Sequence, residues 1–479
     1  MRAVLGINVE SRPSACLITD DGRAVATSEQ HQTLGVPDAD RGIPSRAIST
    51  CLDSLGVAPD ELAAVVLCGA LATDCLLEIP RDRIHSIDRH LAHAASAFYP
   101  SGFEDASILV VERGSSARVR ASAYRARGGA PEPVLASPDP DDDSDARAMV
   151  ELASQLGGGD VADLMDLATR GTSPADAAWA AGDALRRVAK QLAMQLVERT
   201  GARKLCIAGD AAVHGLAQLD PRGNPWLDQV YVPPAPGEVG TSVGAALFGW
   251  CELLGAPPPC ELETAFRGRP YRDAEIVNAL VPYRTSHQLG PRRPDQVLDD
   301  VADLLAGGAL VAWFDGGAAL GDPVGCRCVL ASPRCVPLAS RIGAGLGRPS
   351  FRALTAVVLI EEAEDYFALS GHSPFAHRVA RVLPHRTREI PLVVRGDGTS
   401  RVATIDRWRS PRLDDLLRRF RRRGGPPVLT SVPLCEPGSS AVETPTDALR
   451  LWDRAGFDAI YLQGHLLVRS AEPSYSDES

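Results

Sequence analysis

Histidines gather in one short segment of this 479-residue chain, at a spacing that could support chemistry. The segment 84–93 reads IHSIDRHLAH, and its pattern predicts a helix that begins near Asp88. On such a helix His90 and His93 lie three residues apart on one face, so they could bind a metal ion together or transfer protons. The alternative is that each histidine forms only a local hydrogen bond.

Two glycine-containing turns could hold the phosphate groups of a nucleotide. Gly209 and Asp210 follow an expected strand, and the segment 236–244, PGEVGTSVG, supplies Gly237 and Gly240. Backbone amides between a strand and a helix can cradle phosphate. The alternative is that glycine serves there only to let strand and helix pack closely.

The second of these turns also fits the G-x-S-x-G pattern of serine hydrolases, with Ser242 as the nucleophile. In that pattern a strand runs directly into the serine. Here Pro233, Pro234 and Pro236 interrupt the strand, so the hydrolase interpretation is the less favoured one.

Three arginines in the second half of the chain are further candidates for binding phosphate. Arg327, Arg352 and Arg401 each carry a guanidinium group that could fork onto phosphate oxygens. The alternative is that each forms an ordinary surface ion pair.

The cysteines are more readily explained as core residues than as a site. Cys326, Cys328 and Cys335 raise a zinc hypothesis, but the C-x-C spacing and the missing fourth ligand favour buried thiols. Eleven irregularly spaced cysteines in a large acidic chain also do not form a secreted disulfide framework.

Net charge and hydropathy exclude several classes of partner. The formal net charge of −11 argues against a nucleic-acid or anionic-membrane surface, and the run Arg418–Arg423 is expected on the solvated face of a helix that ends at Gly424. The first residues read as an apolar strand rather than a leader peptide, and no apolar run reaches membrane-spanning length. We therefore expect a cytoplasmic protein that binds neither nucleic acid nor membrane.

The elements that would position these residues alternate between strand and helix, which predicts a layered α/β fold. An early strand, turn, strand, strand arrangement is typical of actin-like and sugar-kinase-like ATPase domains. The expected elements are strands at 3–9, 14–19 and 24–27, a helix at 44–56, a strand at 64–68, a helix at 89–98 and a strand at 107–112.

The later part of the chain predicts a surface loop, a linker and a second domain. Residues 127–145 are rich in Gly, Pro and Asp and predict a loop, and a long helix at 174–199 leads into a strand at 204–208. A proline-rich stretch begins the predicted linker, and a helix at 296–305 and a strand at 309–314 open the second α/β unit. The predicted domains are 1–255 and 296–479, with the linker at 256–295.

Several longer motifs resemble the O-carbamoyltransferases of nodulation-factor and antibiotic biosynthesis. The segment 90–103, HLAHAASAFYPSGF, is similar to that family's HHLAHAASAxYPSxF signature. Further matches follow in the family's order over nearly the whole chain, and the chain is identified as a member. They are LCIAG at 205–209, VPPAPG at 232–237, GAA at 244–246, WFDG at 313–316, DGTSRV at 397–402 and ETPTDAL at 443–449.

The resemblance implies an actin/sugar-kinase-type N-terminal domain and a smaller C-terminal domain similar to threonylcarbamoyl-adenylate synthases. It implies ATP and a divalent metal as cofactors. The small domain would join carbamoyl phosphate to ATP, and the large domain would transfer the carbamoyl group to the hydroxyl of a small-molecule acceptor. A metal can polarise the carbonyl and orient the alcohol, and an adenylate is a good leaving group.

The chain departs from the family at polar site positions. The family's metal ligands are the first and last histidines of HHLAH and an aspartate, which correspond here to Arg89, His93 and Glu238. A family lysine is replaced by Asp163, and Asp210 adds a carboxylate at a helix N-terminus. Apolar framework positions are kept.

This pattern leaves two hypotheses about function. The first is a pseudoenzyme of antibiotic-type biosynthesis that partners a homologous active carbamoyltransferase or another biosynthetic enzyme. The second is an O-carbamoyl or other acyl transferase with a remodelled site, in which His90, His93, Asp210, His214 and Glu238 form the polar set.

Overall fold

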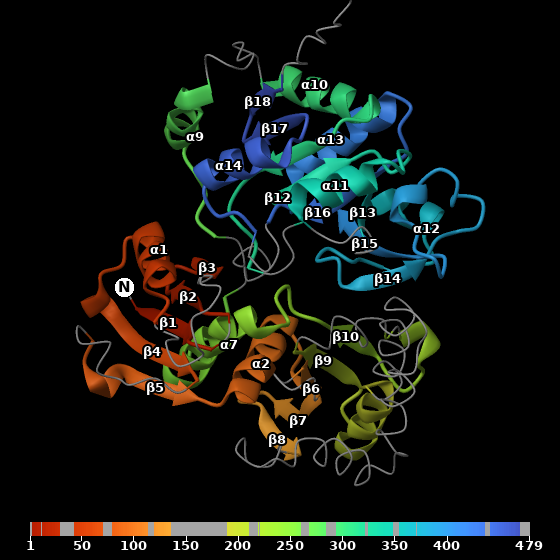
Figure 1. The fold of residues 1–479 in the computed structure, drawn as a ribbon. Coiled ribbons are helices and arrows are strands. Elements are labelled where there is room, and N and C mark those ends of the chain that lie inside the picture. Colours follow the sequence, from red (N-terminus) through yellow and green to blue (C-terminus); the bar gives the residue numbers. More distant parts are fainter. Residues whose placement is uncertain are drawn as a thin grey trace, which may run out of the picture. The chain divides into compact units, whose positions relative to one another are not determined.

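The computed structural model divides the chain into two compact units, each described here by itself (Figure 1). Unit 1 comprises residues 1–269 with 320–322, and unit 2 comprises 270–319 and 323–479. The structure describes residues 2–10, 12–28, 43–69, 79–113, 119–135, 189–209, 219, 221–259, 268–283, 294–320, 324–347, 354–369, 371–435 and 441–469.

The first half of unit 1 is a five-stranded sheet with the order β3-β2-β1-β4-β5. Strands β1, β2 and β3 are antiparallel neighbours, whereas β4 and β5 continue from β1 in parallel. Gly22, with φ of 81°, turns the chain between β2 and β3, as the Asp-Gly pair predicts. The strands are β1 (Ala3–Asn8), β2 (Ser14–Thr19), β3 (Ala24–Ser28), β4 (Leu62–Cys68) and β5 (Ile84–Ile87).

The second half of unit 1 repeats that arrangement in a second five-stranded sheet. Its order is β8-β7-β6-β9-β10, with β6, β7 and β8 antiparallel and with β9 and β10 parallel to β6. This duplicated topology confirms the predicted actin/sugar-kinase-like α/β class. The strands are β6 (Asp105–Arg113), β7 (Val119–Arg127), β8 (Glu132–Leu135), β9 (Lys204–Ala208) and β10 (Gln229–Tyr231).

Two helices, α2 (Arg89–Phe98) and α7 (Thr241–Phe248), occupy equivalent places after β5 and β10 and pack against each other. Helix α7 lies on β1, and α2 lies on β6 and β9. A Cβ atom on Gly244 would lie 1.7 Å from the carbonyl oxygen of Ala92, so the two helix backbones meet at that glycine. Small residues along both helices permit this close crossing, which sets the position of α2 between the two halves.

Most of the expected elements of unit 1 are present, but the predicted loop at 127–145 is wrong in part. Strand β8 lies inside it and pairs with β7, because Val134 packs against the hydrophobic core of the second half. Helix α1 (Ser45–Leu55) matches the expected helix at 44–56. The predicted helix at 174–199 is described only from residue 189, where it is helical.

Unit 2 is built on a mixed eight-stranded sheet with the order β14-β15-β13-β16-β12-β11-β17-β18. Helices α10 and α13 bury their apolar residues on one face, and α9, α11 and α14 pack on the other. The strands are β11 (Val311–Phe314), β12 (Arg327–Ala331), β13 (Thr355–Leu359), β14 (Arg378–Arg381), β15 (Thr399–Ile405), β16 (Val428–Pro433), β17 (Ala459–Leu462) and β18 (His465–Val468). The helices are α9 (Asp273–Leu280), α10 (Pro294–Ala306), α11 (Leu338–Leu346), α12 (Ala363–Tyr366), α13 (Pro411–Arg422) and α14 (Pro445–Ala455).

The predicted linker at 256–295 is corrected in its second half. The units divide between residues 269 and 270, and α9 lies inside the predicted linker. Ile276 and Leu280 of α9 are buried in the core of unit 2, so this stretch is part of the domain. The prolines at the start of the segment favoured a linker, and the amphipathic pattern of the helix that follows is too short to outweigh them.

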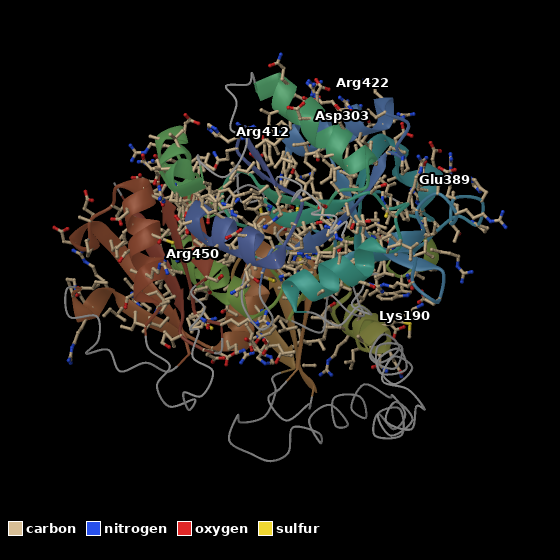
Figure 2. The ribbon with its side chains drawn as sticks, turned by 45° about the horizontal axis from the view of Figure 1, so that its top comes forward. Lys190, Asp303, Glu389, Arg412, Arg422 and Arg450 are labelled. Carbon is tan, nitrogen blue, oxygen red and sulfur yellow. The ribbon has the colours of Figure 1, made fainter. Side chains whose placement is uncertain are left out.

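Arg421 and Arg422 at the end of α13 are exposed on the surface of unit 2, as the sequence predicts, whereas Arg419 and Arg423 are largely covered. Arg419 and Arg423 pair with Asp299 on α10, and Arg423 also pairs with Asp303. Figure 2 shows Asp303 and Arg422 on that surface. Cys326 and Cys328 are buried, as predicted, whereas Cys335 is only partly buried. Among the described helices, none combines the length and apolar character that crossing a membrane requires.

Candidate functional site: an arginine–carboxylate centre

Helix α2 begins where the sequence predicts, and Asp88 fixes its first turn. The Asp88 carboxylate accepts hydrogen bonds from the backbone amides of His90 (2.8 Å) and Leu91 (3.2 Å). An aspartate in this position satisfies amides that the helix itself leaves unbonded. This cap fixes the backbone of the first turns of α2, which carry Arg89, His90 and His93.

The Arg89 guanidinium contacts three carboxylates that come from three different elements. Nη1 lies 2.5 Å from Oε2 of Glu10, which follows β1. Nη2 lies 3.0 Å from Oε1 of Glu112 on β6 and 2.9 Å from Oε1 of Glu238, in the short turn that precedes α7. The centre therefore joins both halves of unit 1.

Both predicted histidines lie against one of these carboxylates, Glu112. Nε2 of His93 is 2.5 Å from Oε1 of Glu112, a close contact that lacks the alignment of a straight hydrogen bond. Nε2 of His90 is 3.3 Å from the other oxygen, Oε2, and Nδ1 of His90 is 2.6 Å from Oγ of Ser122. His93 is fully buried, and its Nδ1 has no hydrogen-bond partner among the described residues.

Electrostatics keep Glu112 ionised although its side chain is only 2% exposed. Burial alone would raise the pKa of Glu112, but His93, His90 and Arg89 together hold that pKa well below its ordinary range. Burial likewise opposes the charge of Arg89, yet Glu112, Glu10 and Glu238 raise the pKa of the guanidinium. The centre is thus a fixed ionic cluster with three carboxylates around one permanent cation.

The two glycine turns predicted to bind phosphate are brought together. The amide of Gly209 donates to the carbonyl of Pro236 over 2.6 Å. A Cβ on Gly209 would lie 2.1 Å from the Val111 carbonyl oxygen, and one on Gly240 would lie 1.9 Å from that of Ala235. Packing by itself therefore requires glycine at both positions, and phosphate binding by Gly209, Gly237 and Gly240 stays a prediction.

Ser242 does not have the surroundings of a hydrolase nucleophile. It lies in the first turn of α7 and is fully buried. Its hydroxyl accepts a hydrogen bond from Ser14 and donates one to the carbonyl of Val239. The sharp strand-to-helix turn that exposes such a serine is replaced by a short helical turn.

Two of the three candidate arginines, Arg327 and Arg401, form hydrogen bonds within the fold. Arg327 is fully buried, donates to the carbonyls of Asp315, Cys326 and Gly316, and lies over the ring of Phe314. Its burial lowers the pKa of the guanidinium. Arg401 donates to the carbonyl of Ala376.

Asp163, Asp210, His214 and Arg352 lie outside the described residues. The structure thus brings together His90, His93 and Glu238 of the predicted set, around Arg89.

Sequence reasoning did not identify Glu10, Glu112 or Ser122 as site residues. The duplicated fold offered a signal: Glu10 follows the first strand of one half, and Glu112 lies near the end of the first strand of the other. The ends of equivalent strands in the two halves face a shared centre. Local sequence patterns do not reveal this duplication, so the signal could be used only once the fold was known.

A divalent cation does not fit this arrangement of donors. One oxygen each of Glu10, Glu112 and Glu238 is already engaged by the Arg89 guanidinium. Within the described part of the chain, no group of three or more histidine, cysteine or acidic side chains is arranged to hold a metal ion. The expected ligation by His93 and Glu238 stays a prediction that the position of Arg89 does not favour.

A family model and several known proteins are similar to this chain, and they agree with one another. Residues 302–469 match the family model described as "Carbamoyltransferase C-terminus". The chain is 24% identical over 553 residues to nodulation protein NolNO of Sinorhizobium fredii, a match that covers 97% of this chain and 80% of that protein. It is 28% identical over 302 residues to nodulation protein NolO of Bradyrhizobium diazoefficiens, which covers 62% of this chain and 55% of that protein.

Among solved structures, a ROK family glucokinase from Streptomyces griseus aligns with 51% of this chain and 98% of its own. The TM-score is 0.30 and the identity 16%.

Proposed function

The chain belongs to the carbamoyltransferase family, and we propose that it is a member without metal-dependent carbamoyl transfer. Its role would be that of a pseudoenzyme in antibiotic-type biosynthesis, as a partner subunit of a homologous active carbamoyltransferase or of another biosynthetic enzyme. The folded framework of both units is retained while polar site positions are changed. That is the pattern expected when folding is still required but the original chemistry is not.

The observation that carries this proposal is the contact of Arg89 with three carboxylates. The family resemblance places a metal-binding histidine at position 89. A guanidinium is a permanent cation with no lone pair to offer a metal, and here it takes up the oxygens of Glu10, Glu112 and Glu238. Without the metal, the carbonyl of a carbamoyl donor loses its Lewis acid.

The proposal is tested with the purified full chain, ATP, carbamoyl phosphate and Mg²⁺ or Mn²⁺. We expect no release of AMP or phosphate above that of a sample without protein, while an active relative assayed in parallel releases both. Co-purification from the native host should capture a second biosynthetic protein. A chain that turns over ATP with carbamoyl phosphate, or that stays monomeric without any partner, would contradict the proposal.

A second function, acyl transfer without a metal, is favoured by the contacts of His90. Its two ring nitrogens lie 2.6 Å from the Ser122 hydroxyl and 3.3 Å from the Glu112 carboxylate. In this alternative His90 takes the proton of a small-molecule hydroxyl as the oxygen attacks the carbamoyl carbon, and phosphate leaves with the electrons of the broken C–O bond.

The alternative predicts a carbamoylated alcohol in the presence of EDTA, detected by mass spectrometry, and loss of that product in His90→Gln. The control is His465→Gln. His465 lies in unit 2, outside the centre, and its ring pairs with the exposed carboxylate of Asp273. Equal product from wild type and His90→Gln would eliminate this alternative.

A further inference from the structure

We propose that Arg89 is the resident cation of the carboxylate centre, and that removing its side chain turns this centre into a binding site for one divalent cation. The wild-type chain would then need no divalent ion to balance Glu10, Glu112 and Glu238. This inference goes beyond the proposed function, because it holds whether or not the chain transfers carbamoyl groups.

The geometry of the three carboxylates is that of donors around one cation. They come from positions 79, 23 and 149 residues away from Arg89 in the chain, yet each places an oxygen 2.5 to 3.0 Å from its guanidinium. Such convergence from separate elements is what holds a bound ion, whereas a chance surface ion pair joins two side chains.

A second and independent observation is the position of His93. The side chain is fully buried, its Nδ1 has no hydrogen-bond partner among the described residues, and its Nε2 points at the same Glu112 oxygen that binds Arg89. Carboxylate oxygens and imidazole nitrogens together suit Mn²⁺, Fe²⁺ and Zn²⁺. Side chains of the types that suit a transition metal therefore surround the Arg89 guanidinium, although with Arg89 in place they are not arranged to hold a metal ion.

Charge explains why the centre needs a cation of some kind. Three carboxylates face one another here, and the Glu112 side chain is 2% exposed while that of Glu238 is 15% exposed. Like charges at such separations repel strongly where water is excluded. When Arg89 is removed, the carboxylates must either bind protons or bind another cation, and a divalent ion offers more charge than the guanidinium did.

The experiment compares full-length wild type with Arg89→Ala and Arg89→Gln, each with EDTA and with Mn²⁺. Thermal unfolding of wild type should be the same in both solutions. Both variants should unfold several degrees lower in EDTA and recover with Mn²⁺. Calorimetry and Mn²⁺ electron paramagnetic resonance should find one bound ion per variant chain, at least about 10-fold tighter than in wild type.

Two controls locate the ion. Arg203→Ala removes another arginine of unit 1, whose pair with Asp228 is half-exposed, and should gain no Mn²⁺ binding. Adding Glu238→Gln to Arg89→Ala should abolish the gain, because one ligand loses its charge.

The inference is overturned if wild type binds one Mn²⁺ as tightly as the variants, or if neither variant gains binding. Arg89→Gln keeps much of the side-chain volume, so it provides the test should Arg89→Ala fail to fold. Metal-free carbamoyl transfer by wild type would contradict the proposed pseudoenzyme role and leave this inference intact.

Discussion

At the scale of single residues, Glu112 connects the Arg89 guanidinium with both histidines of the centre. It contacts Arg89, His90 and His93 at once and is almost fully buried. A buried carboxylate with these partners stabilises the folded chain only while it is ionised. With an arginine at position 89, the neighbouring carboxylates form ion pairs with its guanidinium.

Glu112→Gln should lower the free energy of unfolding at pH 7 by about 3 kcal/mol, since Arg89 loses a buried partner. The folded-state pKa of Glu112 is depressed, so its contribution is complete above the unfolded value of about 4.3 and is lost as the pH falls below it. In urea unfolding experiments, the free energy of unfolding should therefore fall less between pH 7 and pH 3 for the variant than for wild type.

The matched control is Glu132→Gln, which changes an exposed carboxylate on the same sheet. Its unfolding free energy should stay close to that of wild type at pH 7. Equal effects of the two substitutions would show that the ionic cluster around Arg89 adds no stability.

At the scale of elements, the crossing of α2 and α7 positions the centre. Helix α2 carries Arg89 and both histidines, and the turn before α7 carries Glu238. The two helices approach each other most closely at Gly244 and Ala92. Any change in this crossing moves the carboxylates relative to the guanidinium.

Gly244→Ala should destabilise unit 1 by about 3 kcal/mol or more, because the new Cβ would lie 1.7 Å from the Ala92 carbonyl oxygen and must push the helices apart. Chemical denaturation measures the loss. Gly223→Ala is the control, because a Cβ there meets nothing within 4 Å. If Gly244→Ala is as stable as Gly223→Ala, the helices do not cross as closely as described.

Loss of the Asp88 cap of α2 should lower the free energy of unfolding by less than Gly244→Ala does. Asp88→Ala removes the acceptor for the amides of His90 and Leu91 and should cost about 1 kcal/mol in unfolding free energy. Asp88→Asn keeps an acceptor oxygen and should recover most of it. The same denaturation curves decide this, and equal losses for both variants would refute the capping role.

At the scale of the whole molecule, each unit has its own hydrophobic cores. The cores of unit 1 lie on its two sheets and on α2 and α7, and those of unit 2 lie on the two faces of its eight-stranded sheet. Chains built in this way often unfold one domain at a time.

Calorimetry should therefore resolve two unfolding transitions. Gly244→Ala should lower only the transition of unit 1. Trp313→Ala removes a fully buried ring stacked on Tyr461 at 4.1 Å and should lower only the other, by an amount equivalent to about 4 kcal/mol. If each substitution shifts both transitions equally, the units unfold together.

Local sequence determined a large part of this protein. Alternating apolar strands and helices predict the α/β class, Asp88 predicts the start of α2, and the motif at 90–103 predicts the family. Strand β8 and helix α9 were missed because glycine, proline and acidic residues around them outweigh a short apolar pattern.

Only the tertiary structure decided what surrounds Arg89. The sequence shows that a histidine of the family motif is an arginine, but it does not show which groups that arginine contacts. Glu10, Glu112 and Glu238 reach it because strand ends of both halves and the turn before α7 meet at the start of α2. Local sequence patterns determine the helices and strands, whereas contacts between distant residues depend on how those elements pack. Here that packing places three carboxylates around the Arg89 guanidinium.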